Sequence, residues 1–158
     1  MRIAIASDHA ALEMRKQLVK FLTELGHEVE DCGPDSTESV DYPDFAAEVG
    51  KRVATGQVSR GVLCCGSGVG MAIAANKVPG VRAVVVHSDW EAEMSRRHND
   101  ANVACFGARQ QTAWMAERYL KLFLATAFEG GRHTRRVEKI CGLDGSEQPS
   151  EWASGGDS

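Results

Sequence analysis

Gly61-Val-Leu-Cys-Cys-Gly-Ser-Gly-Val-Gly70 is the stretch of this sequence that decides the fold. The apolar run Gly61–Cys65 leads directly into a turn with glycine at alternate positions, and a helical pattern follows from about Val69 to Asn76. A wholly apolar strand that passes through a glycine turn into a helix is typical of a parallel sheet covered by helices on both faces.

The alternation of strand and helix extends in both directions from this stretch. Further strands are expected at Arg2–Ser7, His27–Asp31, Val81–Val86 and Ala101–Phe106. Further helices are expected at Ala10–Leu25, Asp44–Thr55, Asp89–His98, Thr112–Ala127 and Arg132–Ile140, with Asp89 as an N-cap. The pattern predicts a three-layer α/β/α, Rossmann-like domain with a five-stranded parallel sheet. This domain is expected to span residues 1–143, and residues 144–158, rich in Ser, Gly and acidic residues, predict a flexible tail.

Composition excludes several classes of protein. The chain has 158 residues, of which 43% are hydrophobic and 25% charged, as in an ordinary globular domain. Its net charge of −4 argues against a general nucleic-acid binder. No apolar run approaches the ~20 residues of a membrane span, and Asp8 and His9 interrupt what would be a signal peptide's apolar centre. A cytoplasmic protein without nucleic-acid or membrane partners is expected.

The five cysteines form neither a CxxC motif nor a cluster with zinc-ligand spacing. They predict reduced thiols rather than a metal site. Cys65 stands apart because it precedes the glycine turn. Glycines let the backbone amides of such a turn point into one concavity, and the helix start adds partial positive charge. The turn can bind a phosphate or an oxyanion, and a thiol at its rim gains thiolate character, which suits a nucleophile or a base.

Two other interpretations of the glycine turn stay open on pattern alone. It could be an ordinary strand–helix turn beside a core cysteine. It could also be a dinucleotide fingerprint, but its GxGxG spacing and its place after the third strand argue against a nicotinamide cofactor.

Basic and acidic residues elsewhere suggest parts of a site for an anion. Arg132 and Arg136 project from one face of the last helix, which suits a phosphate, although they could also be a solvated basic helix start. Asp8 and His9 follow the first strand, at the sheet edge where ligands bind, although Asp8 could simply cap a helix. His98 ends a helix and lies across the sheet from that edge. Its cation could merely complement the helix dipole.

A set of short motifs, in this order along the chain, resembles one family: the type B ribose-5-phosphate isomerases and their relatives acting on allose or galactose 6-phosphates. The matching motifs are Ser7–Ala10, Asp41–Pro43, Cys65–Gly70, Ala74–Lys77, Arg97–Asn102, Phe106–Arg109 and Gly130–His133.

The resemblance implies an aldose–ketose isomerase that works through an enediolate without metal or cofactor. Cys65 would be the base, amides of Gly66, Gly68 and Gly70 would stabilise the enediolate, and Ser67 would shuttle protons between its oxygens. One branch of the family has a glutamate base where this chain has Met71. Methionine cannot take a proton, which places this sequence with the cysteine-using branch.

The resemblance also assigns the binding residues. His98 would open the furanose ring with Tyr42 nearby, Asp8 would steer sugar hydroxyls, and Asn99 would bind substrate. The phosphate would be held by His9, Arg109, Arg132 and Arg136. Family members are homodimers or tetramers with shared active sites, which would bring His98 to a neighbour's strand ends. Ribose 5-phosphate is the expected substrate. Allose 6-phosphate, galactose 6-phosphate, a tetrulose phosphate and a non-catalytic phosphosugar-binding role remain open.

Overall fold

A single parallel sheet forms the centre of the protein in the computed structural model, which describes residues 1–146. Its strand order is β2-β1-β3-β5-β4, and all neighbours are parallel. The strands are β1 (Arg2–Ser7), β2 (Glu28–Asp31), β3 (Arg60–Cys65), β4 (Ala83–Val85) and β5 (Val103–Gly107). The predicted five-stranded parallel sheet is therefore confirmed, with the strand that leads into the glycine turn at its centre.

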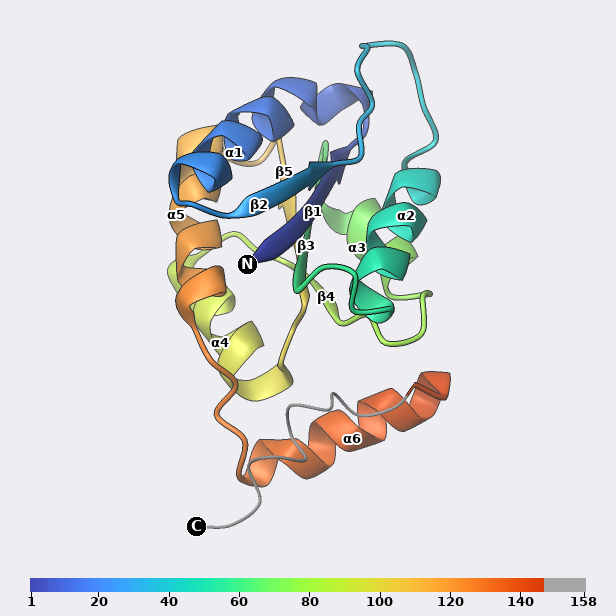
Figure 1. The fold of residues 1–158 in the computed structure, drawn as a ribbon, viewed down its shortest axis with the longest axis vertical. Helices are drawn as coiled ribbons and strands as arrows, with labels where there is room; N and C mark the ends of the chain where they lie inside the picture. Colours follow the sequence, from blue (N-terminus) through green and yellow to red (C-terminus); the bar gives the residue numbers. More distant parts are fainter. Residues whose placement is uncertain (147–158) are drawn as a thin grey trace.

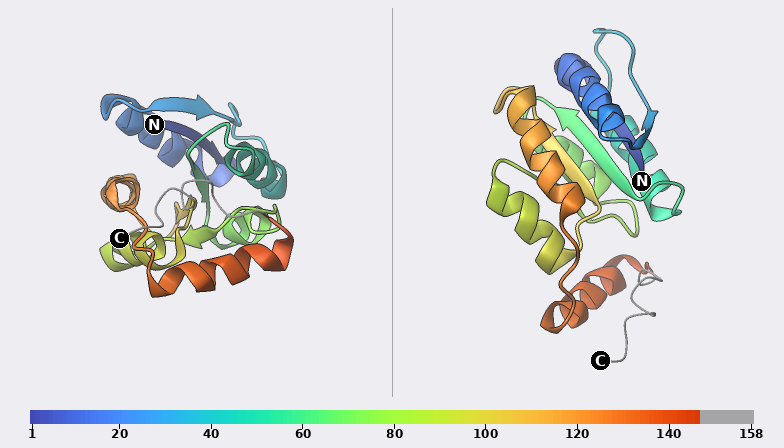
Figure 2. Two further views of the ribbon diagram at one scale, coloured as in Figure 1. Left: turned by 60° about the horizontal axis from the view of Figure 1, so that its bottom comes forward. Right: turned by 60° about the vertical axis from the view of Figure 1, so that its left-hand side comes forward.

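Helices cover both faces of the sheet (Figure 1). On one face lie α1 (Leu12–Glu24), α4 (Asp89–Asn99) and α5 (Ala113–Ala125), and on the other lie α2 (Tyr42–Ala54) and α3 (Val69–Ala75). The short 3-10 helix η1 (His9–Ala11) precedes α1. The last helix, α6 (Arg132–Asp144), belongs to neither layer and lies beyond the ends at which the strands begin (Figures 1 and 2). The three-layer α/β/α architecture is confirmed.

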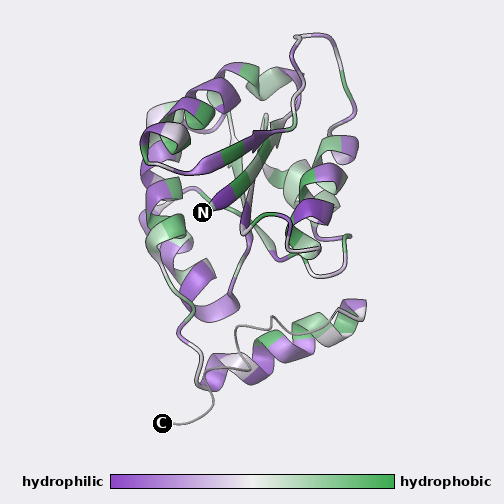
Figure 3. Ribbon diagram, in the orientation of Figure 1, coloured by the Kyte–Doolittle hydropathy of each residue, from purple (hydrophilic) through white to green (hydrophobic). Residues whose placement is uncertain are grey.

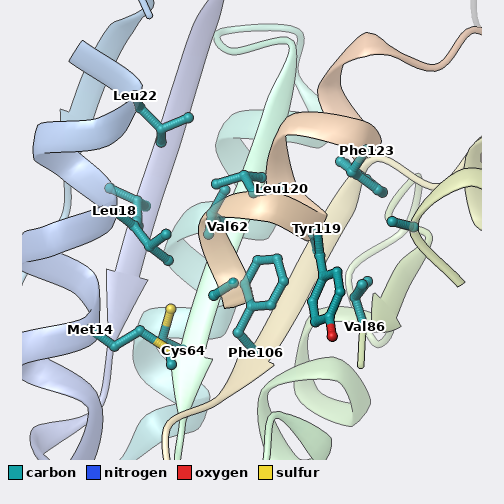
Figure 4. Packing of buried hydrophobic residues seen from close by; sticks show 14 of the residues in the cluster. Met14, Leu18, Leu22, Val62, Cys64, Val86, Phe106, Tyr119, Leu120 and Phe123 are labelled. Atoms are coloured by element: carbon teal, nitrogen blue, oxygen red, sulfur yellow. The ribbon is translucent and has the colours of Figure 1, made fainter. Parts of the chain in front are cut away.

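The two faces of the sheet are packed differently. The cluster beneath α1, α4 and α5 contains large side chains, among them Leu18, Leu120 and Phe123, all fully buried (Figure 4). Burying one such side chain stabilises the fold by roughly 1.5–3 kcal/mol. The cluster beneath α2 and α3 is built largely from alanine and valine. A Cβ atom on Gly61 would lie 2.7 Å from Val49, so α2 packs closely on β3.

Several predicted boundaries were wrong, each for a local reason. Helix α2 begins at Tyr42 rather than Asp44, because Pro43 fits a first helical turn, where no backbone N–H is needed. Asp89 is not the N-cap of α4. Ser88 is, since its hydroxyl accepts a hydrogen bond from the Glu91 amide at 3.1 Å, and Asp89 instead pairs with Arg118.

The edge strand and the last helix also differ from expectation. Strand β4 covers Ala83–Val85 instead of Val81–Val86, since the Arg82 amide donates to the Asn102 side chain at 2.7 Å rather than to a strand. Helix α6 continues past Ile140 to Asp144, one residue beyond the predicted domain end, and Gly145 with φ of 74° terminates it. The predicted tail lies, from residue 147 on, outside the described residues.

Two expectations drawn from composition can be compared with residues 1–146. None of the helices there has the length and apolar character needed to cross a lipid bilayer. The cysteines are all free thiols.

Candidate active site

The glycine turn after β3 is fixed against the neighbouring strand β5. Gly68 has φ of 79°, a left-handed conformation that glycine adopts without strain. A Cβ atom on Gly107 of β5 would lie 2.6 Å from the Ser67 carbonyl carbon, so the two backbones are in direct contact. The Ala108 and Arg109 amides donate to the carbonyls of Cys65 and Gly66 at 2.8 and 3.0 Å. The turn is therefore rigidly placed at the carboxyl end of the sheet.

Cys65, the last residue of β3, directs its sulfur at this turn. Its Sγ accepts a hydrogen bond from the Gly68 amide at 3.1 Å, and the residue is 5% exposed. Cys64 and Cys105 are fully buried, and burial raises the pKa of both thiols, so they remain protonated. Of these three neighbouring cysteines, only Cys65 faces the turn amides, as the sequence predicts. Met71 is buried in the first turn of α3.

Two side chains flank the turn. A Cβ atom on Gly66 would lie 3.1 Å from a guanidinium nitrogen of Arg109, which places this cation against the start of the turn. A Cβ atom on Gly70 would lie 2.7 Å from the Tyr42 ring, which covers the start of α3. Ser67, at the tip, is partly exposed and accepts a hydrogen bond from the Val69 amide at 3.2 Å. A thiol, a hydroxyl, a phenol and a guanidinium thus meet around one turn.

Asp8 and His9 lie at the end of β1, next to β3. One carboxylate oxygen of Asp8 accepts from the amides of Ala10 and Ala11 at 2.9 and 3.2 Å, so this residue does cap the following helical turn. The Asp8 amide donates to the Cys64 carbonyl at 3.0 Å. His9 Nδ1 accepts from the Val40 amide at 3.2 Å. Because Nδ1 is an acceptor there, the ring proton of His9 belongs on Nε2, which is left to donate to a ligand.

The other predicted residues gather at the opposite end of the sheet. The His98 ring stacks on the His133 ring of α6, with centroids 4.2 Å apart and planes inclined by 14°. Arg97 and Glu129 form an ion pair at 3.1 Å beside this stack. Arg132 is exposed at the start of α6, one turn before Arg136, which is also exposed. The structure therefore brings His98 together with the basic end of α6.

A buried ion-pair network holds the turn that follows His98. Asp100 adopts φ of 46°, which is unusual for a residue with a side chain. Its carboxylate accepts from Arg96 at 2.7 Å and from Arg82 at 3.2 Å. The Asn99 carbonyl accepts from the same Arg82 side chain at 3.2 Å. Sequence reasoning assigned no role to this network. The motif Arg97–Asn102 contains its acid but not the arginine partners that identify it.

His133 is a second residue that sequence reasoning left without a role. It is 6% exposed, and its Nε2 has no hydrogen-bond partner among residues 1–146. Burial lowers the pKa of His133, and so do the neighbouring charges of His98 and Arg132. The motif Gly130–His133 is the signal for this residue in the sequence. It predicts a phosphate-binding role for Arg132 and none for His133.

The same cluster contains three side chains of the kinds that bind metal ions. His98, Glu129 and His133 offer ligand atoms within 4.8 Å of one another. However, the lone pairs of two stacked rings lie in separate, nearly parallel planes, and Glu129 is already paired with Arg97. Without rotation of a ring, these donors do not converge on one ion.

Within one chain, the predicted site is thus divided between the two opposite edges of the sheet. Residues at the carboxyl ends of parallel strands share an edge of the sheet. Asp8, His9, Tyr42, Cys65, Ser67 and Arg109, with the turn glycines, belong to this edge. His98 and Asn99 end α4 at the other edge, where α6 carries Arg132 and Arg136 (Figure 1).

Comparison with known proteins identifies the family. A sequence model of the ribose/galactose isomerases matches residues 3–140. The chain is 43% identical over 143 residues to ribose-5-phosphate isomerase B of Escherichia coli strain K12, covering 90% of this chain and 96% of that protein. The structure of ribose-5-phosphate isomerase B from Clostridium thermocellum matches with a TM-score of 0.90 at 43% identity, covering 92% of this chain and 98% of that one.

A second solved structure is described with a ligand. It is ribose-5-phosphate isomerase B of Mycoplasma genitalium with bound ribulose-5-phosphate, which matches with a TM-score of 0.88 at 40% identity over 92% of this chain and 97% of that one. The resemblance seen in the motifs is confirmed over nearly the whole described chain, and the protein belongs to the ribose/galactose isomerase family.

Proposed function

We propose that this aldose–ketose isomerase interconverts ribose 5-phosphate and ribulose 5-phosphate, with Cys65 as the base. The observation that carries the proposal is the hydrogen bond from the Gly68 amide to the Cys65 sulfur, at the carboxyl end of the central strand. Relatives that bear the name ribose-5-phosphate isomerase B, and the Mycoplasma genitalium structure with ribulose-5-phosphate, support this choice of substrate.

The proton transfers follow from the position of the sulfur. In the open-chain aldose, the Cys65 thiolate removes the proton on C2, and the electron pair of that C–H bond moves toward the C1 carbonyl oxygen to give an enediolate. The Cys65 thiol then returns a proton to C1, while Ser67 transfers a proton between O2 and O1, which leaves the ketose. Donors in the turn other than Gly68 stabilise the enediolate, and each such donor is worth roughly 3 kcal/mol of barrier.

The phosphate is held away from the reacting carbons. Arg109 lies against the turn, and His9 carries its proton on Nε2, so the two can donate to phosphate oxygens from this chain. Asp8 and Tyr42 line the same edge and would contact sugar hydroxyls. Binding of the phosphate holds C1 and C2 next to the base. The binding energy therefore lowers the barrier of the reaction and does not only tighten substrate binding.

We further propose a homodimer in which each site combines two subunits. Within one chain, His98, Asn99, Arg132 and Arg136 lie at the edge away from Cys65. Apolar side chains that a second copy would cover are exposed on α3 and α6: Ile73 is 60% exposed and Leu143 87%. Figure 3 shows hydrophobic residues among the hydrophilic ones of α6. In the dimer, His98 opens the furanose ring on the partner's site, Asn99 binds the sugar, and Arg132 and Arg136 complete the phosphate pocket.

A cytoplasmic location is part of the proposal. The free cysteines support it, because thiols stay reduced in that compartment.

The substrate is tested with a panel of phosphorylated aldoses containing four, five or six carbons. We expect aldose–ketose exchange to be fastest with ribose 5-phosphate. A higher kcat/KM for allose 6-phosphate, galactose 6-phosphate or a tetrose phosphate would contradict the substrate assignment but leave the isomerase chemistry in place.

The base is tested with Cys65→Ala. General-base catalysis contributes about 10²–10⁴-fold, so turnover should fall by that order while affinity for inorganic phosphate is kept. Retained turnover would contradict the role of Cys65.

Shared sites are tested by mixing two inactive variants, Cys65→Ala and His98→Asn. In a mixed dimer one site carries both substitutions and the other carries neither, so a statistical mixture should recover about a quarter of full activity. If each chain held a complete site of its own, mixing would restore nothing.

A further inference from the structure

Arg15 is the largest fully buried side chain among residues 1–146, and the proposed reaction gives it no task. It projects from α1 toward the carboxyl ends of β1 and β2, the edge at which the catalytic turn lies. A charged group is retained in such a place only when it is paired and hydrogen-bonded, since burial of an unpaired charge is strongly unfavourable. Its partners therefore show what this cation holds in place.

The guanidinium joins the sheet to the long segment that follows β2. Its Nη1 donates to the Ser7 hydroxyl at 3.2 Å, at the end of β1. Its Nε lies 3.2 Å from a carboxylate oxygen of Asp31, the last residue of β2, as an ion pair without hydrogen-bond geometry, and its Nη2 lies 3.6 Å from Asp35. Asp35 is fully exposed, so its ion pair with Arg15 connects a buried guanidinium to the outer surface of the segment.

The segment between β2 and α2, residues 32–41, is anchored to the site at both of its ends. At its start, the Asp31 carboxylate accepts from the Gly33 amide at 3.0 Å, and the Gly33 carbonyl accepts from the Ser7 amide at 3.1 Å. At its far end, the Val40 amide donates to His9 Nδ1 at 3.2 Å. Tyr42, which follows, lies against Gly70 of the catalytic turn.

We propose that Arg15 is a positioning residue for the phosphate site. By pairing with Asp31 and Asp35 it holds residues 32–41 in the course that brings the Val40 amide to His9. That hydrogen bond fixes the His9 ring and keeps its proton on Nε2, where it can donate to a phosphate oxygen. This inference rests on the proposed function, in which His9 binds the substrate phosphate.

The test compares Arg15→Met with Arg52→Met. Arg52 is a matched control, because it also pairs with β2, through Glu30 at 2.6 Å, and with Glu48 at 2.7 Å, but neither partner belongs to residues 32–41. For Arg15→Met we expect KM for ribose 5-phosphate and the inhibition constant of inorganic phosphate to rise together, by about fivefold or more, with kcat changed less than about twofold. Hydrogen exchange at the Val40 amide should be faster. Arg52→Met should leave all of these unchanged.

A second variant covers the case in which Arg15→Met does not fold. Asp31→Asn keeps an oxygen acceptor for the Gly33 amide but removes the charge that faces Arg15, and it should shift phosphate inhibition and Val40 exchange in the same direction. A folded Arg15→Met protein, or failing that Asp31→Asn, with unaltered phosphate inhibition and Val40 exchange would overturn the proposal.

The outcome is separable from that of the proposed function. Neither hydrogen exchange at the Val40 amide nor the binding of inorganic phosphate, measured by calorimetry, requires turnover. They would still report on Arg15 if the protein did not isomerise ribose 5-phosphate.

Discussion

The backbone N–H of Gly68 donates to the sulfur of Cys65 at 3.1 Å, inside a turn that is closed on its other side by β5. A Cβ atom on Gly68 would lie 3.1 Å from the Phe106 carbonyl carbon, so no side chain fits between turn and strand. Under the proposed mechanism the donors of the turn are therefore divided: the Gly68 amide interacts with the base, and other donors stabilise the enediolate.

Iodoacetamide should modify Cys65 and inactivate the enzyme. The Cys65 sulfur faces the turn and accepts a hydrogen bond from the Gly68 amide, whereas burial raises the pKa of Cys64 and Cys105, which keeps those thiols protonated and unreactive. Peptide mass spectrometry should find the label on Cys65, and ribose 5-phosphate should slow both labelling and loss of activity. If the inactivated enzyme carried the label only on other cysteines, the assignment of Cys65 would be wrong.

Arg132→Ala should weaken binding of the substrate phosphate. The guanidinium is exposed at the start of α6 and paired with no carboxylate among residues 1–146, so its loss removes a charge-assisted contact without disturbing the fold. Such contacts contribute about 1.5–3 kcal/mol, which corresponds to a KM increase of roughly 10–100-fold. Steady-state kinetics would show it, and an unchanged KM would remove Arg132 from the phosphate pocket.

Gly107→Ala should damage catalysis more than stability alone explains. The new Cβ would lie 2.6 Å from the Ser67 backbone, which cannot move without displacing the turn that carries Cys65. Gly61→Ala is a matched control on β3, because its Cβ would overlap Val49 at 2.7 Å in the core instead. Overpacking should cost each variant about 1–3 kcal/mol in unfolding experiments. Only Gly107→Ala should lower the kcat of the folded protein. Equal kcat values would show that the turn tolerates displacement.

Stability should decrease as the pH falls through the titration range of His133. Its pKa in the folded protein is lowered by burial, by His98 and by Arg132, so the unfolded chain binds a proton near its ordinary value of about 6.5 before the folded protein does. The stabilisation is therefore complete above that value and is lost progressively below it. Urea unfolding of wild type and His133→Gln at pH 7.5, 6.5 and 5.5, at one protein concentration, should show a shallower pH dependence for the variant. Parallel curves would contradict this.

The sequence was sufficient for the order of the elements and for the group of residues that gather at the carboxyl end of the sheet. Strand β3 and its turn are recognisable because an apolar run, alternate glycines and a helical pattern follow one another without a gap. Cys65 and its neighbours could be placed together because parallel strands end at one edge. By contrast, the N-cap of α4 is Ser88 and not Asp89. Serine and aspartate both cap helices well, so only the extended backbone conformation at Ser88 decides between them.

Residues that act through tertiary contacts were beyond prediction from pattern. In the sequence, Arg15 is one polar position among several in a helix. Its ion pairs with Asp31 and Asp35 depend on the course that the chain takes after β2. The stacking of His98 on His133 likewise depends on the position of α6, which lies outside both layers, beyond the ends at which the strands begin. Helical periodicity determines which residues share a face, but not which distant element meets that face.

The division of the site between the two edges of the sheet has a consequence for how the enzyme behaves on dilution. If each site combines two subunits as proposed, a lone subunit carries Cys65 without the His98 that acts on the same sugar, and it cannot complete the reaction. Under the proposed pairing, the rate in very dilute solution follows the square of the subunit concentration rather than the concentration itself. Activity then disappears although every chain is still folded, and it returns as soon as the sample is concentrated.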